Sequence, residues 1–391
     1  MTSEKHRIDT RLIHAGEPGK RICGAVSLPV FQSSTYEYTG QSSYDELKYI
    51  RMNNTPNHEV LHKKLAALEN AEAALVTASG MAAISTTLLA LFSPGDHILV
   101  QNCLYGGTQD LIVSDFVPLG FQFDFIDADD PASWAPKLKS NTRGLYVETI
   151  TNPLLQVGDL KALAEFAGAN GLIAMIDNTF ATPVNFRPAE WGYDISLHSC
   201  TKYLNGHSDI VAGAVIGKDT LLKKIGHKLI HLGGSLDPHA CFLLHRGMKT
   251  LALRVRHQNR SALAIAETLA VHPAVDRVNY PGLPDHPGHG RAREMLEGFG
   301  GMVSFELKGG LEAAERFMQK VTVPIVAPSL GGVETLITRP STTSHAGMSA
   351  GERQAAGITD SLIRLSVGIE DTQDLIDDFE HALNGQPNGR T

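Results

Sequence analysis

From residue 55 onward, the chain alternates between two patterns of hydrophobic and polar positions. Stretches in which apolar residues recur every three or four positions are typical of helices, and the short unbroken apolar runs between them are typical of buried strands. Helical patterns cover residues 55–73, 80–92 and 159–170, and strand-like runs cover residues 73–79, 97–102, 143–149, 172–177, 195–199 and 211–217. Repeated alternation of strand and helix predicts an α/β fold with a mostly parallel central sheet and helices on both faces.

The two ends of the chain follow different patterns. Residues 1–48 are rich in Gly, Ser, Thr and Tyr with little periodicity, which predicts an arm lying over another surface rather than a domain with its own core. Residues 236–273 form one long helical pattern, which predicts a long connecting helix. Further strand-like and helical patterns follow at residues 301–309, 310–321, 362–370 and 372–385. We therefore expect an N-terminal arm (1–48), a large domain that includes the long helix (49–270) and a smaller C-terminal α+β domain (271–391).

Composition and charge narrow the class of protein. The 391 residues, 42% of them hydrophobic, suffice for a sizeable core, and the formal net charge of −8 is not gathered into a long acidic or basic run. These features favour small-molecule partners over nucleic acid or a membrane surface. The N-terminus lacks the apolar core of a signal peptide, and the longest weakly polar stretch, residues 82–92, is too short to span a bilayer. Four widely spaced cysteines without a CxxC pair predict a soluble, cytoplasmic protein with no cysteine-rich metal site.

Polar residues stand where three of the predicted strands end. Open parallel sheets bind ligands at the carboxyl ends of their strands, so these positions are the first candidates for chemistry. Ser79, Gly80 and Met81 follow a strand and open a helix, where free backbone N–H groups and the helix dipole favour a phosphate. Taken alone, they fit an ordinary serine N-cap somewhat better. Asp177 ends a second strand, where an aspartate is at least as often a turn or cap residue.

The third strand end delivers Ser199, Thr201 and Lys202, within the segment HSCTKYLNGHSD. A lysine in such a loop is usually a solvated surface charge. Together, however, a phosphate site, a carboxylate and a lysine at three strand ends meet the needs of pyridoxal 5′-phosphate. A protein that binds this cofactor must hold its phosphate, keep its ring nitrogen protonated and capture its aldehyde. To act as a nucleophile near pH 7, this lysine needs a pKa about three units below its usual 10.4, equivalent to about 4 kcal/mol, which desolvation can supply.

Several segments carry a resemblance to a known family. The chain resembles the transsulfuration enzymes, the Cys/Met metabolism family of fold type I pyridoxal phosphate proteins, in the segments ASGMAAI, DNTFATP, HSCTKYLNGHSD, RGMKTLALR, SLGGVETL and LIRLSVGIED. The resemblance extends from about residue 10 to residue 385 in the family's order. It implies an aspartate aminotransferase-like fold, pyridoxal phosphate as cofactor, and a carbon–sulfur bond made or broken at the β- or γ-carbon of an amino acid. It also implies a homotetramer built from dimers with shared active sites.

The same resemblance implies roles for individual residues of the cofactor site. Lys202 corresponds to the lysine that forms the Schiff base and carries protons, and Asp177 to the partner of the ring nitrogen. The other cofactor contacts that it implies are a stacking tyrosine, Tyr105, and phosphate ligands at Gly80, Met81, Ser199 and Thr201.

Further residues match positions outside this set. Tyr49 and Arg51 match a Tyr-x-Arg pair that reaches the phosphate of a neighbouring subunit, which would make the dimer catalytically necessary. Arg364 matches the arginine that binds the substrate carboxylate, a task for which a guanidinium fork is suited, and Asn152 and Ser329 match its helpers.

The chain departs from the family pattern next to the Tyr-x-Arg pair. Lys48 stands where γ-lyases of animal and yeast type carry a glutamate, so a cation there would meet the distal part of the substrate, and the reversed order of Thr55 and Pro56 leaves the path of this loop open. Glu334 matches a glutamate of many γ-synthases and γ-lyases, with a role in substrate binding. Because these signals conflict, we expect elimination by a cystathionine-type lyase and keep γ-replacement on an activated homoserine, by a cystathionine γ-synthase or O-acylhomoserine sulfhydrylase, as the alternative.

Two further hypotheses belong to other classes. The segment HEVLH, residues 58–62, fits the H-E-x-x-H pattern of zinc peptidases, although a five-residue pattern arises easily by chance and no third-ligand signature follows it. A catalytically silent pyridoxal phosphate binder is the other alternative, against which the presence of the lysine, aspartate and tyrosine argues.

Overall fold

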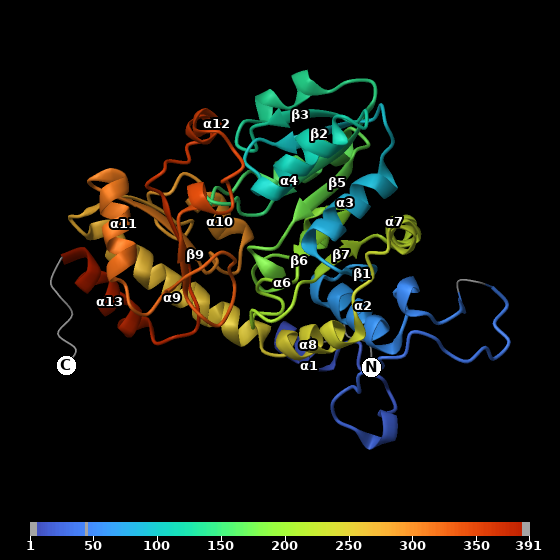
Figure 1. The fold of residues 1–391 in the computed structure, drawn as a ribbon. Helices are drawn as coiled ribbons and strands as arrows, with labels where there is room; N and C mark the ends of the chain where they lie inside the picture. Colours follow the sequence, from blue (N-terminus) through green and yellow to red (C-terminus); the bar gives the residue numbers. More distant parts are fainter. Residues whose placement is uncertain (1–5, 44–45, 385–391) are drawn as a thin grey trace.

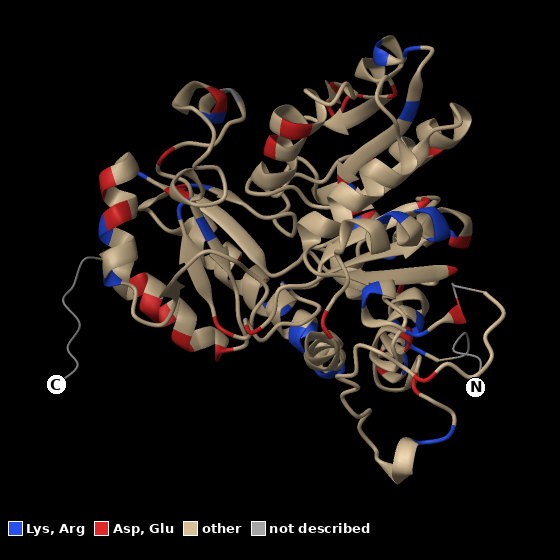
Figure 2. Cartoon of the chain, turned by 45° about the vertical axis from the view of Figure 1, so that its right-hand side comes forward, with Lys and Arg blue, Asp and Glu red and all other residues tan. Residues whose placement is uncertain are grey.

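The computed structural model describes residues 6–43 and 46–384 and arranges them around two sheets (Figure 1). Residues 1–5 and 44–45 of the expected arm, and residues 385–391 of the expected small domain, lie outside the described residues. None of the described helices combines the length and the apolar composition needed to traverse a bilayer. Acidic and basic residues are interspersed along the outer helices (Figure 2).

The larger sheet is seven-stranded and mostly parallel. Its spatial order is β1 (Ala73–Thr77), β7 (Gly213–Gly217), β6 (Ile195–Ser199), β5 (Ile173–Asp177), β4 (Thr142–Glu148), β2 (His97–Gln101) and β3 (Gln122–Ile126). Neighbours from β6 to β3 pair in parallel, and β7 runs antiparallel to both of its neighbours. The predicted α/β class is therefore confirmed. The sequence pattern did not predict β3, an edge strand whose side chains are mostly half-buried or exposed.

The two faces of this sheet enter different cores, because successive side chains of a strand point to opposite sides. Leu99 and Leu145 belong to one core, whereas their neighbours Ile98 and Tyr146 belong to another. The covering helices include α2 (Pro56–Glu69), α5 (Leu160–Ala169) and α8 (Pro238–Met248) on one face and α3 (Gly80–Leu91) and α7 (Asp219–Leu232) on the other. Burial on both faces explains why these strands appear in the sequence as unbroken apolar runs.

The long helical pattern is divided into two helices, so the expectation of one continuous helix was wrong. α8 ends at Met248, and α9 (Leu251–Val271) begins after Thr250, whose φ of −107° and ψ of 5° depart from helical values. At this break, Gly247 packs against the backbone of Asn205, since a Cβ on Gly247 would lie 2.3 Å from Asn205 O. The first part of α9 contributes to the core of the larger sheet and its last part to the core of the smaller one.

The smaller sheet is five-stranded and lies in the C-terminal part of the chain (Figure 1). Its spatial order is β10 (Ile325–Val326), β11 (Leu336–Thr338), β12 (Ile363–Ser366), β9 (Met302–Leu307) and β8 (Val275–Asn279). It shares a core with α9, α11 (Gly310–Lys320) and α13 (Thr372–Asn384). The sequence pattern missed β8, in which only Val275 is buried.

Short helical segments connect these elements. They are α1 (Ile8–His14), η2 (Ile22–Gly24), η4 (Ile50–Met52), α4 (Gly106–Asp110), η5 (Leu111–Phe116), η6 (Pro131–Ser133), η7 (Ala135–Lys137), α6 (Thr182–Asn185), η8 (Pro188–Trp191), α10 (His289–Met295), η9 (Pro340–Thr342) and α12 (Ala350–Ala355). Leu12 of α1 joins the core of the larger sheet, whereas the blue segments that follow α1 project from the body of the molecule (Figure 1).

Candidate active site

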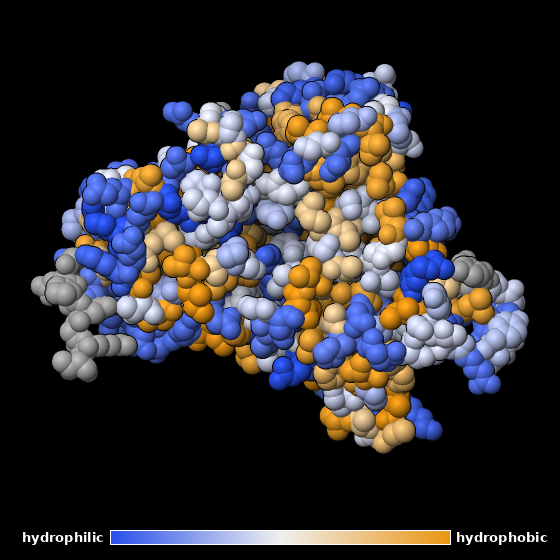
Figure 3. Space-filling model, in the orientation of Figure 1, coloured by the Kyte–Doolittle hydropathy of each residue, from blue (hydrophilic) through white to orange (hydrophobic). Residues whose placement is uncertain are grey.

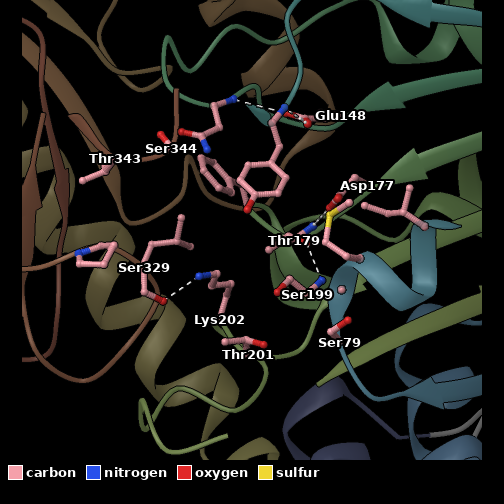
Figure 4. Close-up of a pocket in the computed structure, with 18 of the residues that line it drawn as sticks. Ser79, Glu148, Asp177, Thr179, Ser199, Thr201, Lys202, Ser329, Thr343 and Ser344 are labelled. Carbon is pink, nitrogen blue, oxygen red and sulfur yellow. Dashed lines mark hydrogen bonds between the residues drawn. The ribbon is translucent and has the colours of Figure 1, made fainter. Parts of the chain in front are cut away.

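A cavity of about 680 Å³ lies between the carboxyl ends of the larger sheet's strands and segments of the smaller sheet (Figure 4). The ends of β4, β5 and β6 and the start of α3 line one side, and Arg364 of β12 lies in the lining with residues 328–330 and 342–344. Parallel pairing of β4 with β5 and of β5 with β6 carries their carboxyl ends to one edge. The strand ends singled out in the sequence therefore meet at one cavity.

The start of α3 forms a cradle for an anion. Ser79 caps this helix, since its Oγ accepts a hydrogen bond from the N–H of Ala82 at 3.0 Å. The N–H groups of Gly80 and Met81 lie in the first turn, where no helical carbonyl is available to them and the helix dipole is positive. A Cβ on Gly80 would lie 2.8 Å from Cβ of Ser199, so glycine keeps open the space between α3 and β6.

Ser199 and Thr201, the two predicted phosphate hydroxyls, are not equally available. Thr201 Oγ1 donates to the carbonyl of Ala212 at 3.2 Å and accepts the N–H of the same residue at 3.0 Å. Among the described residues, Ser199 Oγ has no hydrogen-bond partner, while the backbone N–H of Ser199 donates to Thr179 Oγ1 at 2.9 Å. The hydroxyl of Ser199 is therefore the better placed of the two to bind an anion.

Two carboxyl groups, those of Asp177 and Glu148, end the paired strands β5 and β4. Burial raises the pKa of Asp177, against the effect of Thr179, whose backbone N–H donates to Oδ1 at 2.9 Å. Burial, followed by the nearby Asp177, also raises the pKa of Glu148. A cation placed beside Asp177, such as a protonated ring nitrogen, would favour the ionised form. Glu148 was not predicted from the sequence as a site residue, although it ends an apolar strand just as Asp177 does.

Glu148 fixes the backbone on which Tyr105 stands. Its Oε1 accepts the N–H of Tyr105 at 2.6 Å, and its Oε2 accepts the N–H of Asn152 at 3.4 Å. Tyr105 immediately precedes α4, lines the cavity and is 39% exposed. An aromatic side chain in this position offers a face on which a planar ring can stack.

Lys202 follows β6 and reaches across the cavity. Its Nζ donates a hydrogen bond to Ser329 Oγ at 2.7 Å, as the dashed line in Figure 4 shows. Burial, followed by the positive charge of Arg364, lowers the pKa of Lys202 to about 8. At pH 7 about one such amine in ten is neutral, compared with roughly one in 2,500 for an exposed lysine, so Lys202 is a far better nucleophile than a surface lysine.

Arg364 is a buried cation, 3% exposed. Its Nη1 donates to Asn152 Oδ1 at 2.9 Å and its Nη2 to the carbonyl of Ser329 at 3.1 Å, and within the described structure both of these partners are uncharged. Burial lowers the pKa of Arg364 to about 10. Because a buried guanidinium without a carboxylate is costly, an anionic ligand that enters the cavity is favoured here.

Ser329 joins these two cations. Its backbone φ of 86° lies in the left-handed region, which a serine rarely adopts. In this conformation its hydroxyl meets Lys202 and its carbonyl meets Arg364. Strained backbone of this kind persists where the surrounding contacts hold it, and it is frequent at functional sites.

Tyr49 and Arg51 do not line the cavity of their own chain. Tyr49 is 38% exposed, and the guanidinium carbon of Arg51 lies 5.7 Å from the centroid of its ring. Arg51 Nη1 also donates to the carbonyl of Ile230 at 3.1 Å. Their action on the phosphate of a neighbouring subunit stays a prediction.

Lys48 and Glu334 also lie outside the cavity lining. Lys48 Nζ forms an ion pair with Glu59 and donates to the carbonyl of Asn54 at 3.3 Å. Glu334 Oε2 accepts a hydrogen bond from Ser208 Oγ at 3.2 Å. The substrate-binding roles that the sequence suggested for these two residues stay predictions.

The HEVLH segment lies in α2. His58 is buried, with Thr55 Oγ1 at 2.7 Å from Nδ1 and the carbonyl of Leu236 at 2.7 Å from Nε2. Throughout residues 6–43 and 46–384, no group of three or more His, Cys, Asp or Glu side chains is arranged to hold a metal ion. The buried position of His58 and its hydrogen bonds favour a structural role for the HEVLH segment, in which His58 joins α2 to the loop before α8.

The cavity residues fit pyridoxal phosphate. Gly80 keeps open an anion cradle that any side chain at this position would fill. A carboxyl group at Asp177, an amine at Lys202 and an aromatic side chain at Tyr105 line the same cavity. Arg364 adds a second anion site on the side of the smaller sheet, with the geometry to bind a carboxylate.

Comparison with known proteins gives an independent assignment. Residues 9–384 match the family described as Cys/Met metabolism PLP-dependent enzymes. The chain is 42% identical to the cystathionine beta-lyase of Coxiella burnetii, over 97% of this chain and 99% of that protein. It is 40% identical to the L-methionine gamma-lyase of Fusobacterium nucleatum subsp. polymorphum, over 98% of this chain and 99% of that protein.

A solved structure extends the similarity to three dimensions. The cystathionine gamma synthase from Xanthomonas oryzae pv. oryzae, in complex with cystathionine, matches 97% of this chain with a TM-score of 0.93 and 39% identity, over 98% of its own chain. The similarity therefore covers both sheets and the cavity between them.

We expect Gly80→Ala to weaken the binding of pyridoxal phosphate to cofactor-free protein by about 5- to 150-fold, because an added methyl group that overpacks the cradle costs about 1–3 kcal/mol. The matched control is Gly168→Ala in α5, where an added Cβ meets nothing within 4 Å. Equilibrium titration followed by absorbance measures both dissociation constants. Equal affinity in the two variants would show that this cradle does not hold the phosphate.

The pKa of Lys202 leads to a second expectation. The rate at which added pyridoxal phosphate attaches to cofactor-free protein should rise from pH 6, reach half its maximum near pH 8 and level off about one pH unit higher, because only the neutral amine attacks and burial brings its pKa to about 8. In Arg364→Met the plateau should move to higher pH, since a charge that lowers the pKa is removed. Stopped-flow absorbance measures the rate, and a rise that continues to pH 10 in the parent protein would contradict the assignment.

Proposed function

Because this chain belongs to the Cys/Met metabolism family of pyridoxal phosphate-dependent enzymes, we propose that it cleaves a carbon–sulfur bond at the β- or γ-carbon of a sulfur amino acid, as a cystathionine-type lyase. The observation that carries the proposal is the bridge that Ser329 makes between Lys202 and Arg364. This bridge sets an amine and a guanidinium side by side, as an amino acid with one carboxylate and one reacting α-carbon requires.

The family's cofactor and the residues of this chain divide the chemistry. When bound, pyridoxal phosphate supplies an electron sink for negative charge at the substrate's α-carbon. Asp177 would hold the ring nitrogen in its protonated form, and Tyr105 would hold the ring by stacking. The amides of Gly80 and Met81 would hold the phosphate at the helix N-terminus.

Substrate orientation follows from Arg364. A carboxylate that accepts two hydrogen bonds from its guanidinium fork is fixed in position and direction, and Asn152 and Ser329 keep the fork in place. The α-carbon of a substrate held in this way would lie within reach of Lys202, because Ser329 binds both Lys202 and Arg364. Lys202 would act there as general base on the α-proton, and its pKa near 8 suits proton transfer at neutral pH.

Cleavage at the β-carbon and cleavage at the γ-carbon differ in how many protons Lys202 must move. Loss of a β-substituent requires removal of the α-proton alone. Loss of a γ-substituent requires a second proton to leave the β-carbon, and the same amine can serve both steps. Relatives named as β-lyases and γ-lyases match this chain at 42% and 41% identity, which supports a lyase without separating the two positions.

The second candidate function is γ-replacement on an activated homoserine. The observation that favours it is the close structural match to a cystathionine gamma synthase, which has nearly the same identity to this chain as the lyases have. Replacement and elimination share the same early proton transfers. They differ in whether a thiol adds before the product leaves.

We further propose that the active enzyme is a homotetramer of dimers with shared sites. Tyr49 and Arg51 do not line the cavity of their own chain, which is consistent with action in a partner's site. The arm segment at the bottom of Figure 3 carries hydrophobic residues at its surface. Within the arm, the side chain of Val26 is 76% exposed. Apolar side chains gathered on a projecting arm favour contact with another protein surface.

We also propose a cytoplasmic location. In the structure all four cysteines are free thiols: Cys23, Cys103, Cys200 and Cys241. Free thiols persist in a reducing compartment, which supports the proposal. Recovery of the native protein in an exported fraction of its own cells would contradict it.

Incubation with L-cystathionine tests the proposed reaction. We expect release of a keto acid, with pyruvate identifying β-elimination and 2-oxobutyrate identifying γ-elimination, measured by mass spectrometry. Lys202→Ala is the control and should release neither, because it lacks the base and the cofactor amine. If protein that carries its cofactor releases neither keto acid, the lyase proposal fails, and assays with acylated or phosphorylated homoserine plus a thiol test γ-replacement.

Mixed assemblies test the shared site. Arg51→Ala and Lys202→Ala should each be nearly inactive alone, but dimers formed from both contain one site with an intact Lys202 and an intact Arg51 from the partner. Random pairing should therefore restore about a quarter of the parental activity, because about half of the dimers are mixed and each has one active site of two. Activity that stays at the level of the two separate variants would exclude a site shared in this way.

A further inference from the structure

Arg254 of α9 is a buried arginine outside the cavity lining, 4% exposed. In the described structure, the recorded hydrogen bonds of its guanidinium all go to uncharged oxygens. They are Thr250 Oγ1 at 3.1 Å, Tyr203 O at 2.8 Å, Gly247 O at 2.9 Å, Asn205 O at 3.4 Å and Leu204 O at 3.5 Å. Burial of this charge lowers the pKa of Arg254 to about 10, so the fold bears a desolvation cost at a residue that contacts no part of the cavity.

Three of these acceptors belong to the turn that begins at Lys202, residues 202–206, here called the lysine turn. Within it, the N–H of Gly206 donates to the carbonyl of Lys202 at 2.8 Å. The N–H of Asn205 donates to the carbonyl of Cys200, just before the turn, at 3.0 Å. The carbonyls of residues 203–205 have no following helical turn to bind them. A cation beside such carbonyls is favourable for the same reason as at a helix C-terminus.

Close packing leaves the guanidinium little freedom. Gly206 has a φ of +74°, and a Cβ on it would lie 2.0 Å from Nη1 of Arg254. Gly247 at the end of α8 approaches the same turn, since its Cβ would lie 2.3 Å from the carbonyl of Asn205. Glycines at these two positions let the arginine, the lysine turn and the end of α8 meet backbone to backbone.

The opposite side of the lysine turn is held by the segment that contains Ser329. A Cβ on Gly331, whose φ is +73°, would lie 2.7 Å from the backbone nitrogen of Tyr203. Lys202 itself binds Ser329 through Nζ. The lysine turn is therefore enclosed by α9 on one side and by the neighbourhood of Ser329 on the other, and Arg254 is the charged contact on the α9 side.

We propose that Arg254 is a positioning residue whose guanidinium holds the lysine turn so that Lys202 enters the cavity ready to capture the cofactor. The inference rests on the proposed role of Lys202 as the cofactor-binding lysine. A planar fork with five donors can serve carbonyls on the lysine turn and on α8 at once, whereas a lysine in its place offers a single ammonium group on a flexible stem.

Hydrogen exchange of the full-length, cofactor-free protein tests the clamp without relying on activity. In Arg254→Lys and Arg254→Ala, peptides that span residues 200–206 should exchange faster than in the parent, while those of β9 should not change. Gly206→Ala should give the same local pattern, because its methyl group displaces the guanidinium from the other direction. Arg256→Ala is the matched control, since Arg256 lies on the same helix, 44% exposed at its side chain, and pairs with Asp9.

The rate of cofactor attachment separates positioning from simple support of the fold. The absorbance change that follows addition of pyridoxal phosphate should be slowed at least tenfold in Arg254→Ala and unchanged in Arg256→Ala. Free guanidinium ion at millimolar concentration should restore much of the lost rate in Arg254→Ala, whereas equal concentrations of sodium chloride or methylammonium should not. Selective rescue by a planar cation is a result that a merely destabilised protein would not give.

Three results would overturn the proposal: attachment in Arg254→Ala as fast as in the parent, equal slowing in Arg256→Ala, or no rescue by guanidinium. If Arg254→Ala does not fold, Arg254→Lys and Gly206→Ala decide the question by the same exchange and attachment measurements. Failure of the proposed role of Lys202 has a different signature, because attachment would then persist in Lys202→Ala. Failure of the lyase proposal is separate again, since parent protein that carries its cofactor would then release no keto acid from L-cystathionine.

Discussion

Two cations, the half-buried Lys202 and the buried Arg364, line one cavity, and the rest of the site is arranged around them. Burial of Lys202, followed by the charge of Arg364, lowers the pKa of its amine to about 8, which makes the amine reactive near neutral pH. In the described chain both cations bind the uncharged Ser329, and neither forms a hydrogen bond with a carboxylate. Such a site favours anionic ligands, and both the phosphate of the cofactor and the carboxylate of an amino acid are anions.

The two cations belong to different sheets, so the site depends on how the sheets are held together. Lys202 follows a strand of the larger sheet, whereas Arg364 lies within β12 of the smaller one. α9 contributes to the cores of both sheets. Near the start of α9, Arg254 donates hydrogen bonds to the turn that begins at Lys202. The geometry of the reacting amine is therefore set partly by contacts outside the cavity, which fits the need of catalysis for groups that are already oriented.

Much of this arrangement could be predicted from the sequence, and the exceptions have physical causes. Asp177 and Lys202 stand out because Asp177 ends a buried strand and Lys202 comes just after another, and the apolar runs of both strands are unambiguous. The edge strands β3 and β8 were missed because their side chains are largely exposed or half-buried. The break between α8 and α9 was missed because it depends on the packing of Gly247 against Asn205. These residues are far apart in sequence, so the local hydrophobic periodicity contains no sign of their contact. The role of Arg254 was not predicted for the same reason, since its carbonyl partners in the lysine turn are about 50 residues away in sequence.

We propose that Lys202, and no other lysine, holds the cofactor. Borohydride reduction of the purified holoenzyme, followed by proteolysis and mass spectrometry, would fix the cofactor to whichever amine carries it. We expect a single modified peptide with pyridoxal phosphate on Lys202, in stoichiometric yield. A cofactor attached to a different lysine, or a protein that holds pyridoxal phosphate with Lys202 unmodified, would contradict it.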